Sequence, residues 1–288
     1  MNSRDQKLQQ ITDWASSNDN VRAVLLTSSL VNPLAPVDQF SDLDVELVFA
    51  DLQKVLADDL WLSEFGQVIA KISETETAFE GKHAMRMVLY DDYEKVDFKL
   101  YSIPKFLEDV NSDELPEDWD IGYKVILDKD ELTLRLKPAT HQVSLIEKPS
   151  SAEFEQKLND FWWDMTYVIK CLAREDIFYA KFMSENNMRT DYLVPIIEWY
   201  IAVDHEWKVT TNKHGRLFKK YLSAEMWERI EATFSGSDLQ DNWKALIAYG
   251  DLVHELGMEL AHKLQYPYPT ELEQNIRKYL DFVNRSEK

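Results

Sequence analysis

The spacing of apolar positions changes along the first half of the chain and predicts a mixture of helices and strands. Apolar side chains recur every three or four residues in the segments predicted as helices, which are residues 4–17 and 59–71. β-branched runs or alternation of polar and apolar side chains mark the predicted strands, which are residues 21–27, 44–49, 85–90, 96–101 and 123–127. Residues 91–95 are rich in turn formers, so we predict a hairpin between the two strands that they separate.

The pattern changes near residue 148, beyond which almost every segment has helical period. Ser150 or Ser151 is placed to cap the first helix, with Glu153 in the first turn, where the helix dipole favours an acid. That helix is predicted to reach Leu172, and further helices are predicted at about residues 175–187, 190–204, 214–221, 224–233, 238–264 and 270–284. The predicted fold class is α+β: a mixed β-sheet domain with flanking helices over residues 1–147, then an all-helical bundle domain over residues 148–288.

Composition narrows the function classes. The chain has 288 residues, a formal net charge of −20, seven glycines and one cysteine. The glycines do not form GxxxxGK[ST] or GxGxxG, which excludes a P-loop NTPase and the usual dinucleotide fingerprint. One cysteine excludes an internal disulfide and a cysteine-based zinc cluster. Because the chain has no long uncharged apolar run and its first residues lack a signal-peptide pattern, we expect a cytoplasmic protein without a membrane span.

The negative charge bears on the choice of partners. It repels nucleic acid and anionic lipid, so we expect neither as a partner. It permits a small polycationic substrate, but the same charge is also explained by solubility alone.

One group of polar residues lies between the first two predicted strands. Asp42 and Asp44 are two residues apart at a strand start, so both carboxylates point to the same side of the sheet. Such hard oxygen ligands suit Mg²⁺, which completes its shell with phosphate oxygens. If the later strand with Asp97 lies beside them, three carboxylates meet and can hold metal ions. Ser28 and Ser29 end the first strand, where hydroxyl and backbone N–H groups can hold a triphosphate.

Each of these features has an ordinary structural alternative. Two aspartates at a strand end often face solvent and have no function. An aspartate in the middle of a strand, such as Asp97, often lies on the solvent-exposed face of a sheet. In the helical half, Asp164, Glu198 and Trp199 lie in aromatic segments that can bind the ammonium groups and ring of a cationic sugar, but Trp-rich helical stripes are mostly core. The more specific signal is the order of two serines, D-x-D and a later Asp, which is the layout of the nucleotidyltransferase superfamily.

The sequence resembles the streptomycin (aminoglycoside 6-)adenylyltransferase family over nearly its whole length. The family stretch GSR-x-N, followed by D-x-FQD-[YF]-D-I, is matched by Ser28–Asn32 and Asp38–Val45. The stretch L-x-ED-x-x-K-[IL]-DLTL is matched by Leu89–Leu100. Shorter family stretches are matched, in order, by Trp61–Gly66, Val125–Asp130, Pro149–Phe154, Phe161–Trp162, Tyr167–Glu175 and, in part, Lys213–Leu222. This order and spacing is hard to obtain by chance.

The resemblance implies a nucleotidyltransferase domain with the metal and nucleotide site, followed by a helical substrate-binding domain. Such an enzyme moves AMP from Mg·ATP to a hydroxyl of an aminoglycoside such as streptomycin, releases pyrophosphate and gives antibiotic resistance. Asp42 and Asp44 would hold Mg²⁺, and Asp97 would complete the metal site or accept the hydroxyl proton. Two further residues would bind the nucleotide. They are Asn32, the last residue of the stretch Ser28–Asn32, and Lys170, on the first helix of the second domain.

The departures from the family leave two alternatives open. Ser28 and Leu30 stand where the family has Gly and Arg, and a shorter stretch at residues 74–81 replaces an acidic, proline-bearing one. The three aspartates remain, so the first hypothesis is an aminoglycoside adenylyltransferase. The second is the same AMP transfer to a different acceptor. The third is a non-catalytic nucleotide-binding relative that has lost turnover.

Overall fold

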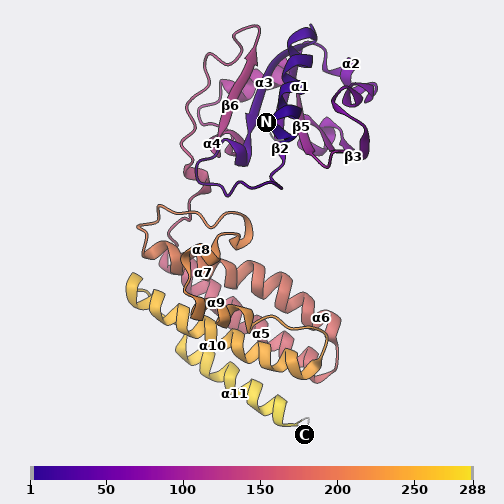
Figure 1. The fold of residues 1–288 in the computed structure, drawn as a ribbon. Coiled ribbons are helices and arrows are strands. Elements are labelled where there is room, and N and C mark those ends of the chain that lie inside the picture. Colours follow the sequence, from indigo (N-terminus) through magenta and orange to yellow (C-terminus); the bar gives the residue numbers. More distant parts are fainter. Residues whose placement is uncertain (1–2, 287–288) are drawn as a thin grey trace. The chain divides into compact units, whose positions relative to one another are not determined.

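The computed structural model describes residues 3–286 and divides the chain into two compact units, Met1–Ser144 and Leu145–Lys288 (Figure 1). The first unit combines a β-sheet with helices, and the second unit is helical. The predicted α+β fold class is therefore confirmed. In residues 3–286, no helix has the length and apolar character needed to cross a membrane.

The first unit is built on a six-stranded mixed sheet with strand order β3-β4-β5-β2-β1-β6. Neighbouring strands are antiparallel except for β2 and β5, which run parallel. The strands are β1 (Val21–Thr27), β2 (Leu43–Phe49), β3 (Val68–Glu74), β4 (Ala84–Tyr90), β5 (Lys95–Ser102) and β6 (Tyr123–Asp128). All five predicted strands are present, and the predicted hairpin is the β4–β5 pair.

Apolar side chains on the two faces of this sheet form two separate cores. The first core includes Val45 and Leu47 of β2 and is covered by α1 and η2. The second includes Val48 of β2 and Tyr101 of β5 and is covered by α3 and α4. The helical segments of this unit are α1 (Ser3–Ser17), η1 (Ser28–Leu30), α2 (Leu52–Leu56), η2 (Leu60–Phe65), η3 (Glu76–Phe79), α3 (Ile103–Val110), α4 (Glu117–Asp120) and η4 (Gln142–Ser144). Because side chains alternate along a strand, even-numbered residues of β2 face the second core.

The predicted helix over residues 59–71 is wrong in its second half. A 3₁₀ helix ends at Phe65, and Gly66 follows with φ of +134°, a backbone conformation that side chains rarely adopt. The chain then enters β3, the edge strand of the sheet, where Ile69 and Ile72 are exposed. Ile69 and Ile72 are three residues apart, which is a helical spacing, and this edge strand lacks the alternation of polar and apolar side chains that identifies a strand.

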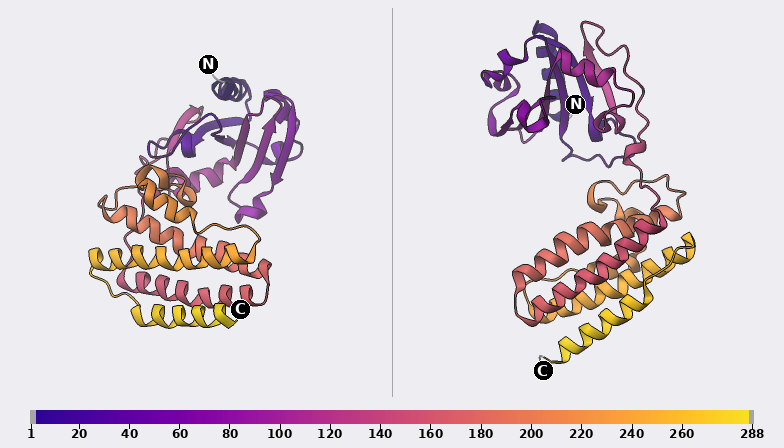
Figure 2. Two further views of the ribbon diagram at one scale, coloured as in Figure 1. Left: turned by 60° about the horizontal axis from the view of Figure 1, so that its bottom comes forward. Right: turned by 180° about the vertical axis from the view of Figure 1, so that it is seen from behind.

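The second unit is a bundle of long helices that run side by side (Figure 2). α5 packs against α10, α11 and the segment η5, while α7 packs against α10. The elements are α5 (Ser151–Ala173), α6 (Ile177–Lys181), η5 (Phe182–Leu193), α7 (Val194–Val203), η6 (Lys213–Gly215), α8 (Phe218–Tyr221), α9 (Ala224–Glu231), α10 (Leu239–Leu264) and α11 (Thr270–Ser286). Ser150 and Glu153 form a capping box at the start of α5, which confirms the predicted helix start.

The predicted break between residues 187 and 190 is absent, because the chain is helical from α6 through α7. The intervening η5 is a π-helix, wound more widely than an α-helix. Two features accompany this winding. The Ser184 carbonyl accepts a hydrogen bond from the Tyr249 hydroxyl at 3.1 Å, and Pro195 lacks the N–H for an α-helical bond. The helix continues through the predicted break, and Met183, Met188 and Leu193 of η5 are buried.

Candidate functional site

The sheet register places two of the predicted carboxylates opposite each other. β2 and β5 run parallel, and Asp44 pairs with Asp97 across the two strands. β2 and β5 are therefore neighbours, as the predicted meeting of the three carboxylates requires. Both side chains face the side of the sheet that carries the second core, and both are half-buried. Asp42 lies two residues before Asp44 and is more exposed, with 39% of its side chain accessible.

A lysine lies between two of these acids. Lys95 Nζ donates to Asp42 Oδ2 at 2.8 Å and to Asp97 Oδ2 at 2.8 Å. Because Lys95 is two residues before Asp97 on the same strand, both side chains project from the same face. The ammonium and three carboxylates leave the cluster with an excess of negative charge. Lys95 is not among the predicted site residues, although its spacing of two residues from Asp97 is a signal in the sequence that could have identified it.

Burial and neighbouring charge raise the pKa of Asp44 to about 6. Desolvation is the largest cause, and the negative charge of Asp97 is the next. The Ser28 hydroxyl donates to the Asp44 carboxylate and opposes the rise, as does the positive charge of Lys95. Keeping Asp44 ionised beside Asp97 in this desolvated position costs free energy, and a bound cation would reduce that cost.

The segment after β1 lies beside these acids. Ser28 begins the 3₁₀ turn η1 with φ of +65°, in the left-handed region where the related family has Gly. Its backbone N–H donates to the Gly122 carbonyl at 3.2 Å. Asn32 is buried and its side-chain oxygen accepts the Leu34 N–H at 2.8 Å, so it closes the turn that follows. Thus Ser28 reaches Asp44, while Asn32 shapes the loop.

The chemistry of the donor set fits a divalent cation. In residues 3–286, no group of three or more His, Cys, Asp or Glu side chains is arranged to hold a metal ion, and Lys95 is already placed between two of the acids. Asp97 Oδ1 is nevertheless buried and lacks a hydrogen-bond partner among the described residues. Orphaned buried oxygens are rare, and hard carboxylate oxygens are the ligands that Mg²⁺ prefers. The residues therefore fit a cation that would replace the ammonium.

An ion pair between a glutamate and a lysine continues the row on the same face. Glu46 is fully buried and lies opposite Lys99 in the β2–β5 register. Trp119 Nε1 donates to Glu46 Oε2 at 2.8 Å, and Lys99 Nζ lies 3.6 Å from Glu46 Oε1. Desolvation raises the pKa of Glu46 to about 7 despite Lys99. Glu46 is not among the predicted site residues, because its full burial arises from contacts with distant parts of the chain such as Trp119.

The predicted substrate-binding residues differ in their surroundings within the helical unit. Asp164 accepts the Tyr192 hydroxyl at 2.9 Å, and desolvation raises its pKa. Glu198 accepts the Thr211 hydroxyl at 2.7 Å, and its pKa is also raised by burial. Trp199, by contrast, is 9% exposed, with its ring 6.2 Å from that of Phe154. Trp199 therefore packs in the core, and the structure offers little of its ring for stacking with a sugar.

Lys170 is half-buried on α5, where its Nζ lies 4.6 Å from the centre of the Tyr167 ring. This contact with the ring of Tyr167, one turn away, holds the ammonium of Lys170 near the surface of α5. The nucleotide-binding role predicted for Lys170 stays a prediction.

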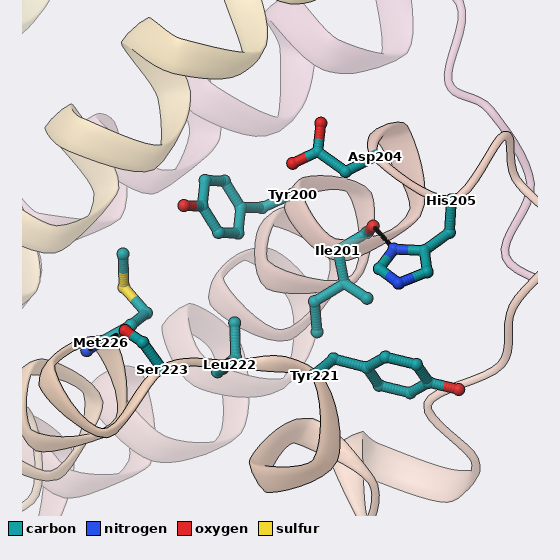
Figure 3. A pocket seen from close by; sticks show the side chains of 8 residues that line it. All are labelled: Tyr200, Ile201, Asp204, His205, Tyr221, Leu222, Ser223 and Met226. Carbon is teal, nitrogen blue, oxygen red and sulfur yellow. Dashed lines mark hydrogen bonds between the residues drawn. The ribbon is translucent and has the colours of Figure 1, made fainter.

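The helical unit also contains a small cavity of about 170 Å³ near the end of α7 (Figure 3). Three polar side chains at its wall have partners within the helical unit. His205 Nδ1 lies 2.8 Å from the Ile201 carbonyl, and Ser223 caps α9. Both carboxylate oxygens of Asp204 accept from Lys263 Nζ at 2.8 Å. The cavity is lined by none of Asp164, Glu198 and Trp199.

Comparison with known proteins identifies a single family across the chain. The family model described as streptomycin adenylyltransferase matches residues 1–283. An aminoglycoside 6-adenylyltransferase of Bacillus subtilis (strain 168) is 29% identical over 290 residues, which covers 98% of this chain and 98% of the relative. One from Campylobacter jejuni is 28% identical, covering 90% and 88%. A solved aminoglycoside 6-adenyltransferase from Bacillus subtilis is 25% identical and covers 99% of each chain, with a TM-score of 0.48.

Proposed function

The chain belongs to the streptomycin adenylyltransferase family, and on that premise we propose that it transfers AMP from Mg·ATP to a hydroxyl of an aminoglycoside, releasing pyrophosphate. It is an adenylyltransferase-type enzyme. The observation that carries the more specific proposal is the pairing of Asp44 with Asp97 on neighbouring parallel strands, with Asp42 at the same strand start. That arrangement supports a divalent cation and a triphosphate at the edge of one sheet face.

The residues have distinct roles in this proposal. Asp42, Asp44 and Asp97 would hold Mg²⁺, which when bound supplies stabilisation of negative charge on the phosphate oxygens. The hydroxyl and backbone N–H groups of Ser28 and Ser29 would orient the phosphates. The acceptor oxygen forms a bond to the α-phosphorus while the bond to the bridging oxygen breaks, and pyrophosphate leaves. Asp97 would either complete the cation site or accept the proton of the acceptor hydroxyl.

The acceptor class rests on charge. The net charge of −20 favours the approach of a polycation. Glu198 and Asp164 are half-buried acids whose pKa values are raised by desolvation, and the ammonium groups of an aminoglycoside would relieve that cost by pairing with them. Because Trp199 is buried, little of its ring is available to stack on the substrate. Lys170 and Asn32 remain predicted nucleotide contacts.

A second candidate is the same AMP transfer to another acceptor. The observation in its favour is Leu30, which stands at η1 where the family has an arginine. Leucine offers no fixed positive charge to a phosphate or an acid, so the network around the reacting groups differs from that of the family. In this case the enzyme would release pyrophosphate with an acceptor other than an aminoglycoside. A third candidate, ATP binding without turnover, would show no pyrophosphate release with any acceptor.

The test is pyrophosphate release from Mg·ATP with a panel of aminoglycosides that includes streptomycin. We expect release with at least one member of the panel and its loss in the Asp42→Asn/Asp44→Asn double variant. Asp113→Asn is the matched control, because it makes the same chemical change at an exposed position outside the cluster. Absence of release with every aminoglycoside, in a protein that still binds ATP, would contradict the proposal and favour the other candidates.

A further inference from the structure

The strongest unexplained feature of the carboxylate cluster is its own cation. Lys95 Nζ makes two hydrogen bonds of 2.8 Å, one to Asp42 and one to Asp97. Lys95 therefore occupies the space between two acids that the proposed function assigns to a divalent cation. Its side chain is 39% accessible, so water surrounds part of it and it can leave by rotating about its own flexible stem.

We propose that Lys95 is an internal counter-ion that holds the metal-free site together and competes with the divalent cation for Asp42 and Asp97. This inference rests on the proposed function, because it concerns the metal site of that reaction. A divalent cation must displace the ammonium before it can contact both acids. Lys95 therefore weakens binding of free metal ions and favours binding of the metal together with the nucleotide, whose phosphates offer the displaced ammonium a new partner.

The geometry of Asp97 supports this competition. One carboxylate oxygen accepts from Lys95, while the other, Oδ1, is buried and lacks a partner among the described residues. An ammonium is a compact donor and leaves this second oxygen unsatisfied. Asp44, opposite Asp97 in the register, adds a further negative charge, which the positive charge of Lys95 partly offsets. The single positive charge of Lys95 therefore compensates only part of the negative charge of the three carboxylates, and a divalent cation would compensate more of it.

This role differs from that of an ordinary surface ion pair, which can be removed with little effect on anything else. If Lys95 competes with metal, its removal has two opposite consequences. The metal-free protein becomes less stable, because the acids lose their counter-ion. Metal binding becomes tighter, because no ammonium has to be displaced and one positive charge fewer repels the ion.

The experiment measures Mn²⁺ binding without nucleotide, from the electron paramagnetic resonance signal of free Mn²⁺, with Mg²⁺ as competitor. We expect Lys95→Met to bind Mn²⁺ about tenfold more tightly than the wild type, from the loss of one unit charge within a few ångströms. Lys95→Arg keeps the charge and is expected to bind as the wild type does. Lys105→Met is the matched control, because Lys105 is also 39% accessible and ion-paired within the same unit.

A second measurement guards against variants that merely fold poorly. The thermal unfolding temperature of Lys95→Met should be lower than that of the wild type in EDTA and should rise more on addition of Mn²⁺. Equal Mn²⁺ affinity in both proteins, reduced in both by Asp44→Asn, would overturn the role of Lys95 and leave the proposed metal site standing. Binding that Asp44→Asn does not weaken in either protein would remove the metal site, and the inference with it.

Discussion

Replacing Asp44 by Asn is expected to make the metal-free protein more stable while abolishing its activity. Asn keeps the shape of the side chain and can still accept the Ser28 hydroxyl, but it carries no charge to desolvate and none to repel Asp97. A folded-state pKa of about 6 against 3.8 in the unfolded chain corresponds to about 3 kcal/mol lost when the carboxylate ionises. Because Asp44 is only half-buried, we expect about 1–3 kcal/mol of stabilisation above pH 7.

The sign of the pH dependence makes this prediction specific. Between pH 3.8 and about 6 the folded wild type binds more protons than the unfolded chain, so its stability falls as pH rises through that window. The Asn variant lacks this fall. The advantage of the variant should therefore be largest above pH 7, and it should shrink as pH is lowered toward 4.

The assay is calorimetric unfolding in EDTA at pH 8 and pH 4.5, following the transition of the unit that contains the sheet. An increase of about 2–4 °C per kcal/mol is expected at pH 8, with pyrophosphate release lost in the presence of Mg·ATP. Asp113→Asn is again the control, because it removes one exposed negative charge from the same unit. A variant that is equally or less stable than the wild type at pH 8, or equally stabilised at both pH values, would refute the reasoning.

Three further predictions concern other parts of the molecule. His83 stacks on Phe79 and has the ring of Tyr101 tilted against it at 5.4 Å, and desolvation lowers the pKa of His83 to about 4. The wild type should therefore lose stability as pH falls from 6.5 toward 4, and His83→Phe should reduce that loss in urea titrations at pH 7 and pH 5. Glu198→Gln should raise the KM for an aminoglycoside while leaving ATP affinity unchanged by calorimetry, whereas Glu206→Gln, at an exposed acid of the same unit, should leave both unchanged. Ser150→Ala should destabilise the helical unit by about 1 kcal/mol, through loss of the capping box, as measured by thermal unfolding; an unchanged transition would mean that the cap contributes nothing.

Local chemistry accounts for the parts of the fold that the sequence predicted correctly. The alternation in β4 and β5 and the turn formers between them specify a hairpin by contacts only a few residues apart. The capping box of α5 involves Ser150 and Glu153, three residues apart. Where the outcome depended on distant neighbours, two predictions were wrong. β3 is an exposed edge strand, and η5 winds as a π-helix where a break was predicted.

The sequence by itself determined that two aspartates lie two residues apart at a strand start, that a third acid lies on a later strand and that two serines come at the end of the first strand. Only the tertiary structure decided that β5 lies parallel to β2 with Asp97 opposite Asp44, and that Lys95 is the cation between Asp42 and Asp97. It also separated Glu198, a half-buried acid, from the neighbouring Trp199, which is core. The physical reason is that strand order, register and burial arise from contacts between residues far apart in the chain, which local spacing does not encode.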